Sequence, residues 1–130
     1  MADSPSRVGY QYVTLRYVPR VAREEFLNVG VVLFAQSADF LAAAYHLDAA
    51  RLRAFDPGVD LDAVDSMLST VQSVCRGETG RGMPHLTSPG RRFGWLAAPR
   101  STSIQPGPRH GGLCLDPETE LARLLDELVR

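Results

Sequence analysis

Arginines, hydroxyl residues and a histidine gather in one Gly- and Pro-rich stretch of this 130-residue chain. The candidate side chains are Arg92, Arg100, Ser101, Thr102, Gln105, Arg109 and His110, and Arg16 joins them from an earlier segment. Guanidinium groups and hydroxyls grip a phosphate or a carboxylate through paired hydrogen bonds, and loop amides add donors. The pattern therefore predicts an anion-binding or partner-binding surface.

The same residues also have a purely structural interpretation, which their loop setting favours. Ser101 and Thr102 can satisfy turn backbone, and His110 can be a turn residue. The arginines can be solvated or pair with the acidic faces of residues 56–66 and 116–127. Residues 76–115 carry six arginines and one glutamate, although the whole chain has a formal net charge of −1. Any attraction for an anion must therefore be local.

No strong catalytic motif accompanies these groups. The histidines His46, His85 and His110 occur singly, and no GxSxG elbow is present. All 14 basic residues are Arg, which excludes a Schiff-base lysine and a P-loop lysine. Cys75 and Cys114 lie far apart and form no CxxC pair, so neither a zinc site nor a disulfide framework is indicated.

Carboxylates are better explained by helix capping than by a metal. Asp60, Asp62 and Asp65 fall at a predicted helix start, and Glu24 and Glu25 are adjacent on the chain. We predict no catalytic residue, no metal and no cofactor, and the sequence leaves open whether the protein is an enzyme.

Three segments near the N-terminus have the composition of strands, residues 9–18, 26–35 and 40–47. The second is apolar on both faces around Gly30, which is typical of a central strand with a bulge or a close backbone approach at the glycine. Links of hairpin length favour antiparallel pairing.

Apolar residues spaced by three and four predict helices over residues 60–76 and 117–130, capped by Asp60 and Asp116. Asp48 can cap a shorter helix that ends at Phe55. The other segments are predicted to be a loop (76–90), a single helical turn (93–96), a short edge strand (101–105) and a turn (107–112).

The predicted fold class is α+β, with an antiparallel sheet led by an N-terminal strand meander and covered by two or three helices. One domain over residues 9–130 would follow a disordered tail over residues 1–8. Hydrophobic residues make up 45% of the chain and charged residues 22%, as in soluble proteins. No apolar run approaches the ~18 residues of a membrane span, so we expect a cytoplasmic protein.

Two stretches resemble a known family. The segments Tyr10–Pro19 (YQYVTLRYVP) and Glu24–Phe34 (EEFLNVGVVLF) are similar to the opening of the bacterial family DUF3037. Residues 93–106 (FGWLAAPRSTSIQP), followed by His110, Gly112 and Leu113, resemble its second signature. The resemblance implies a small bacterial protein often encoded beside a HipA-like kinase, and hence a regulatory role towards a protein partner.

We therefore expect a non-catalytic binding or regulatory module that acts on a protein, with a sheet edge or the arginine loop as its contact surface. The alternative is a small anion- or nucleotide-binding enzyme, which requires Arg100, Gln105 and His110 to converge in one concave pocket. Nucleic-acid binding would require Phe93 and Trp95 to be exposed as stacking groups, and we favour core positions for both. The sequence does not distinguish a monomer from an oligomer.

Overall fold

Three consecutive strands form the antiparallel meander that the sequence predicts. The computed structural model describes residues 6–78 and 85–130. The meander consists of β1 (Val8–Tyr17), β2 (Leu27–Ala35) and β3 (Phe40–Tyr45). Short 3₁₀ turns, η1 (Val21–Arg23) and η2 (Gln36–Ala38), occupy the two links.

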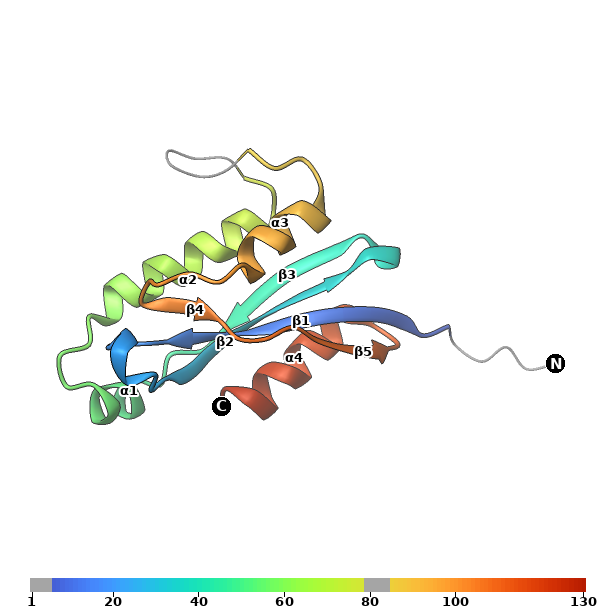
Figure 1. Ribbon diagram of the computed structural model, residues 1–130. Coiled ribbons are helices and arrows are strands. Elements are labelled where there is room, and N and C mark those ends of the chain that lie inside the picture. The colour runs from blue at the N-terminus through green and yellow to red at the C-terminus, as the bar shows by residue number, and fades with distance from the viewer. Residues whose placement is uncertain (1–5, 79–84) are drawn as a thin grey trace.

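Two short strands from the C-terminal half complete the sheet. They are β4 (Ile104–Pro106) and β5 (His110–Cys114). Both pair antiparallel with the second edge of β1, at different places along it. The order across the sheet is β3-β2-β1-β4, with β5 beside the N-terminal half of β1 (Figure 1).

Helices cover both faces of this sheet, which confirms the predicted α+β class. The described residues contain α1 (Ala49–Phe55), α2 (Leu61–Cys75), α3 (Pro89–Ala97) and α4 (Pro117–Leu128). Helices α2 and α3 lie on one side of the sheet, and α4 lies on the other (Figure 1). We refer to these sides as the α2/α3 face and the α4 face.

Alternation along β1 divides the apolar residues between two cores. Val13, Leu15 and Tyr17 join the core under α2 and α3, whereas Tyr10 joins the core under α4. Strand β2 contributes to both cores because it lies inside the sheet and is covered on both faces. This arrangement explains why its sequence is apolar apart from Asn28.

Gly30 on β2 has the role that the sequence predicts for it. A β-bulge shifts the β1–β2 register between Leu15 and Arg16, directly beside the Leu15–Gly30 pair. A Cβ atom on Gly30 would lie 2.9 Å from the carbonyl oxygen of Ala44 on β3. Glycine is therefore required here by a close backbone approach.

Side-chain caps begin the helices as the sequence indicates. Asp48, Asp60 and Asp116 each accept a hydrogen bond from the backbone amide three residues later. Gly77 adopts a left-handed φ of 75° after α2, and its amide donates to Val74. The helix boundaries at residues 61–75 and 117–128 follow from these local signals.

Helix α3 corrects the prediction of a loop over 76–90 and a single helical turn at 93–96. Its nine residues begin at Pro89, behind Ser88, whose hydroxyl accepts from the amide of Arg91. Ser88 is the N-cap, and Pro89 is the first helical residue. Asp116 and Pro117 occupy the same two positions at the start of α4. Part of the predicted loop, residues 79–84, lies outside the described residues.

Strand β5 corrects the turn predicted over residues 107–112. The strand begins at His110, so Gly111 and Gly112 belong to the sheet. A Cβ atom on Gly112 would lie 2.6 Å from the hydroxyl oxygen of Tyr10 on β1. The glycine therefore serves close packing against a tyrosine side chain rather than chain reversal.

The predicted boundaries differ by a few residues elsewhere. Strand β3 ends at Tyr45, and the edge strand runs over Ile104–Pro106 instead of residues 101–105. The tail predicted over residues 1–8 lies outside the described residues for positions 1–5, and β1 already includes Val8. None of the helices in the described ranges has the length and apolar character needed to cross a membrane.

Candidate functional site

Four of the predicted site residues lie on the α2/α3 face. Arg100 and Thr102 line a groove beside α2. The guanidinium carbon of Arg109 lies 5.2 Å from the ring centroid of Phe93, a core residue of the same face. Arg92, on α3, donates to the carbonyl oxygen of Leu86 at 3.3 Å.

Three others, Arg16, Gln105 and His110, lie on the α4 face because of the way β4 and β5 pair with β1. Ile104 pairs with the core residue Tyr17, so its neighbour Gln105 pairs with Arg16 and projects to the opposite side. His110 pairs with Tyr12, and the two rings stack with centroids 5.2 Å apart.

The sheet thus separates side chains that the enzyme alternative requires in one pocket. Arg100 lies on one face, whereas Gln105 and His110 lie on the other. Ser101 is exposed in the segment between α3 and β4, and its side chain makes no hydrogen bond among the described contacts. The predicted residues are brought together as two smaller groups, one on each face of the sheet.

The group on the α2/α3 face borders an apolar groove. The groove has a volume of about 230 Å³ and is lined by Met67, Thr70, Val71, Val74, Trp95, Arg100, Thr102 and Ile104. These residues come from α2, from α3, from the segment that leads into β4 and from the first residue of β4. No carboxylate is among them.

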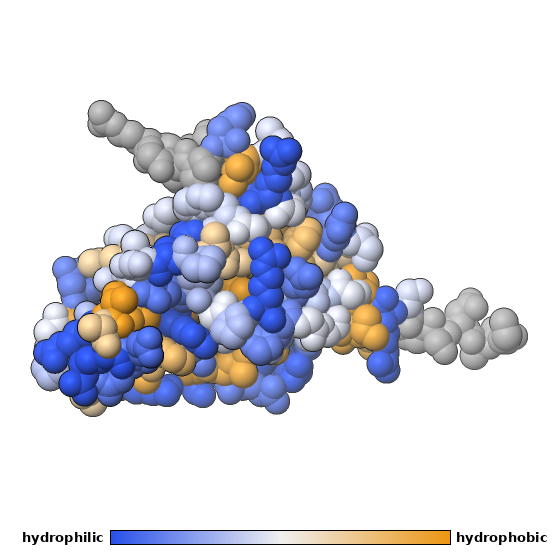
Figure 2. Space-filling view, viewed as in Figure 1, coloured by the Kyte–Doolittle hydropathy of each residue, from blue (hydrophilic) through white to orange (hydrophobic). Residues whose placement is uncertain are grey.

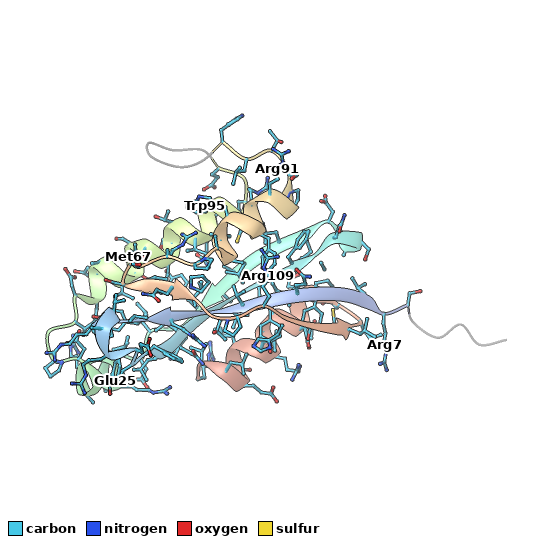
Figure 3. The ribbon with its side chains drawn as sticks, viewed as in Figure 1. Arg7, Glu25, Met67, Arg91, Trp95 and Arg109 are labelled. Carbon is cyan, nitrogen blue, oxygen red and sulfur yellow. The ribbon has the colours of Figure 1, made fainter. Side chains whose placement is uncertain are left out.

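Two large apolar side chains of this groove remain open to solvent. Met67 on α2 is 38% exposed and Trp95 on α3 is 37% exposed. Both lie on the same side of the sheet, and Arg91 lies nearer the N-terminal end of α3 (Figure 3). On the face drawn in Figure 2, hydrophobic surface occurs in separate patches among polar atoms. A groove with an exposed tryptophan and an exposed methionine is typical of a contact surface.

Arg100 places a positive charge at the groove, and its contacts with α3 hold the side chain there. Its guanidinium carbon lies 4.6 Å from the centroid of the Trp95 ring. The guanidinium also donates to the backbone carbonyls of Trp95 and Ala98, at the C-terminal end of α3. Cations are favoured at that end of a helix. Partial burial disfavours the charged form of Arg100 and lowers its pKa. An anion that contacts the guanidinium would therefore stabilise the charged form.

The other aromatic residue of the second signature is not available to a ligand. Phe93 is 1% exposed and stacks on Phe34, with ring centroids 5.3 Å apart. Phe93 therefore occupies the core position that we favoured, and it cannot stack on a base. Trp95 corrects that interpretation, since more than a third of its surface is exposed.

The cysteines do not provide a nucleophile. Cys75 is 4% exposed, and burial raises its pKa to about 12 despite the nearby guanidinium groups of Arg92 and Arg76. Burial also raises the pKa of Cys114. Both thiols are free and buried, and a protonated buried thiol is unreactive.

Sequence reasoning missed Met67, the full length of the helix that carries Trp95, and the exposure of Trp95. Met67 lies outside the stripe of Leu61, Val64 and Leu68 that marks the buried face of α2. Its role depends on where α3 lies against α2, which local patterns do not reveal. The Ser88-Pro89 pair would have located α3 itself.

Comparison with known proteins gives one match. A family model described as "Protein of unknown function (DUF3037)" matches residues 12–129 of the chain. No curated protein and no solved structure matches this chain.

Proposed function

Since this match covers nearly the whole chain, the protein belongs to the DUF3037 family, and we propose that it is a non-catalytic module that binds a protein partner and regulates it. The observation that carries the proposal is the apolar groove between α2, α3 and β4, with Trp95 and Met67 exposed beside Arg100. Tryptophan, arginine and methionine are the residue types that are enriched at the centres of protein interfaces.

The size of the groove supports a protein ligand. Its volume of about 230 Å³ is below the roughly 300–1,000 Å³ that is typical of small-molecule pockets. It offers room for one or two apolar side chains of a partner, which would contact Met67, Val71 and Trp95. The rest of the partner would lie across the surrounding surface.

Charge indicates which partner segment fits. Arg100 lines the groove, and Arg91 lies four residues before Trp95 on α3, so Arg91 and Trp95 project on the same side of that helix. Since none of the described residues that line the groove is acidic, a segment with an apolar residue next to Asp or Glu would be complementary in shape and in charge.

A HipA-like kinase is the first partner to test, because the family resemblance implies such a neighbour. We place the interaction in the cytoplasm, which the free thiols of Cys75 and Cys114 support, since reducing compartments keep cysteines unpaired.

The test compares two exposed apolar residues, one that lines the groove and one that does not. The immobilised wild-type chain, Trp95→Ala and Leu113→Ala would be incubated with lysate of the source cells, and any stoichiometric protein would be identified. Affinity for that purified protein, or for the purified HipA-like kinase, would then be measured by calorimetry. Leu113 is 64% exposed on β5, so Leu113→Ala is the matched control. Met67→Glu provides a second groove variant.

We expect Trp95→Ala to weaken binding by about 30-fold, the effect of losing one central interface residue. Met67→Glu should weaken it through repulsion of the acidic segment, and Leu113→Ala should bind as the wild type does. Failure to recover any stoichiometric partner would contradict the proposal. Equal loss in Trp95→Ala and Leu113→Ala, with both variants folded, would contradict the placement of the contact in the groove.

A further inference from the structure

A row of polar side chains crosses the α4 face where β2, β1 and β4 lie side by side. Arg16 on β1 pairs with Asn28 on β2 and with Gln105 on β4. Paired residues of antiparallel strands project to the same face, so the three side chains form one row. Helix α4 packs mainly on β2 and β3, and Arg16 is only half-buried.

The guanidinium of Arg16 is held from two directions. Its carbon Cζ lies 3.9 Å from the ring centroid of Phe26. The backbone of the buried Gly107 also lies against it, because a Cβ atom on that glycine would be 3.1 Å from Nε and 3.2 Å from Cζ. The same Cβ would be 2.6 Å from Oγ1 of Thr14. The absence of a side chain at position 107 therefore makes room for both polar groups.

The charge of Arg16 has no partner among the described residues. It makes no ion pair with any described carboxylate, and its neighbours in the row are neutral amides. Its Nε is buried without a hydrogen-bond acceptor. The other described arginines are exposed to solvent or, for Arg92 and Arg100, donate to backbone carbonyls.

A half-buried guanidinium without a counter-ion is unfavourable, because partial loss of hydration is not offset by an attractive charge. An oxyanion that contacts the guanidinium would supply that attraction. We propose that Arg16, held between Phe26 and Gly107, is the binding group of a site for a small oxyanion, either a phosphate or a carboxylate.

The chemistry of the site follows from the shape of the guanidinium. Since the guanidinium carbon lies over the Phe26 ring and Nε is buried, the terminal amino groups are the part available to a ligand. Two parallel N–H donors match two oxygens of a phosphate or carboxylate, which an ammonium group cannot do. The hydroxyl of Thr14 lies against the same glycine as the guanidinium and can donate a further hydrogen bond. The site is on the face opposite the groove, so it does not depend on the proposed function.

Titration by NMR tests this site directly. Inorganic phosphate and, separately, acetate would be added to the ¹⁵N-labelled chain at constant ionic strength. The signals followed are the side-chain Nε–H of Arg16 and the backbone amides of Thr14, Gln105 and Gly107. Arg16→Met removes the charge, and Arg16→Lys keeps the charge but removes the paired donors. Arg53→Met is the matched control, because Arg53 is exposed on α1.

We expect saturable shifts in the wild type and in Arg53→Met, with apparent Kd of the order of millimolar. The shifts should be absent in Arg16→Met, and Arg16→Lys should bind about tenfold more weakly. Saturation with phosphate alone would identify a phosphate site, and saturation with acetate alone a carboxylate site.

Chemical shifts that change linearly with the concentration of both phosphate and acetate, without saturation, would overturn the proposal. So would saturable shifts that persist unchanged in Arg16→Met. Should Arg16→Met fail to fold, Arg16→Lys decides the matter, because wild-type affinity in that variant would show that the guanidinium fork is not the binding group.

Discussion

Replacement of Gly30 by alanine should destabilise the protein, because the added methyl group has no space on β2. A Cβ atom at this position would lie 2.9 Å from the carbonyl oxygen of Ala44 and 3.1 Å from Cβ of Tyr45, both on β3. It would also lie 3.3 Å from Cδ1 of Leu15 on β1. The first two are backbone or backbone-proximal atoms, which can move only if β3 moves.

The size of the effect can be worked from two opposing contributions. Insertion of one methyl group into a well-packed site costs about 1–3 kcal/mol. The reduced freedom of the unfolded chain offsets about 0.4–1 kcal/mol of this cost. Because the nearest atom is a backbone oxygen at 2.9 Å, we take the upper half of the insertion cost and expect a net loss of about 1–2.5 kcal/mol in the free energy of unfolding. This corresponds to roughly 3–12 °C in Tm for a chain of this size.

Gly9→Ala is the matched control for this experiment. Gly9 is also in a strand, but a Cβ atom there would lie 3.9 Å from its nearest neighbour, Cδ2 of Leu113, which is an ordinary contact. Urea denaturation followed by the fluorescence of the single tryptophan would measure both variants. The close-approach argument would be refuted by wild-type stability in Gly30→Ala, or by an equal loss in Gly9→Ala.

Two further predictions concern buried titratable groups. Burial, together with hydrogen bonds to Glu120 and Asp56, raises the pKa of Tyr10 and of Tyr17 to about 12. Because ionisation is harder in the folded state, the stabilisation is complete below pH ~10 and is lost as pH rises from there towards 12. Phenolate absorbance should show two tyrosines titrating near 12 in the folded protein, and values near 10 for all four tyrosines would contradict this. Burial raises the pKa of Cys75 to about 12, so iodoacetamide at pH 8 should modify it only after unfolding. Mass spectrometry would detect the adduct, and rapid labelling of the native protein would show that this thiol is accessible.

Much of the fold follows from local sequence signals. The alternation of Val13, Leu15 and Tyr17 predicts β1, and Asp116-Pro117 predicts the start of α4. The double-sided apolar run of β2 predicts an internal strand with both faces covered. These patterns are readable because each reports on the backbone conformation of its own segment.

The candidate sites were harder to predict, because they depend on which face of the sheet each side chain occupies. Arg100 and Gln105 are five residues apart in the sequence, yet the pairing of Ile104 with Tyr17 places them on opposite sides. A shift of that register by one residue would exchange the faces. No local pattern in so short a strand encodes the register.

Local patterns in the amino-acid sequence predict the family, the α+β class, the strand meander, the capped helices α1, α2 and α4, and a bulge or a close backbone approach at Gly30. Only the packing of distant segments places Trp95 and Met67 in one groove and leaves Arg16, between Phe26 and Gly107, with no counter-ion among the described residues. The physical reason is range: caps, turns and periodicity act within a few residues, whereas a binding surface is made where distant segments pack against one another.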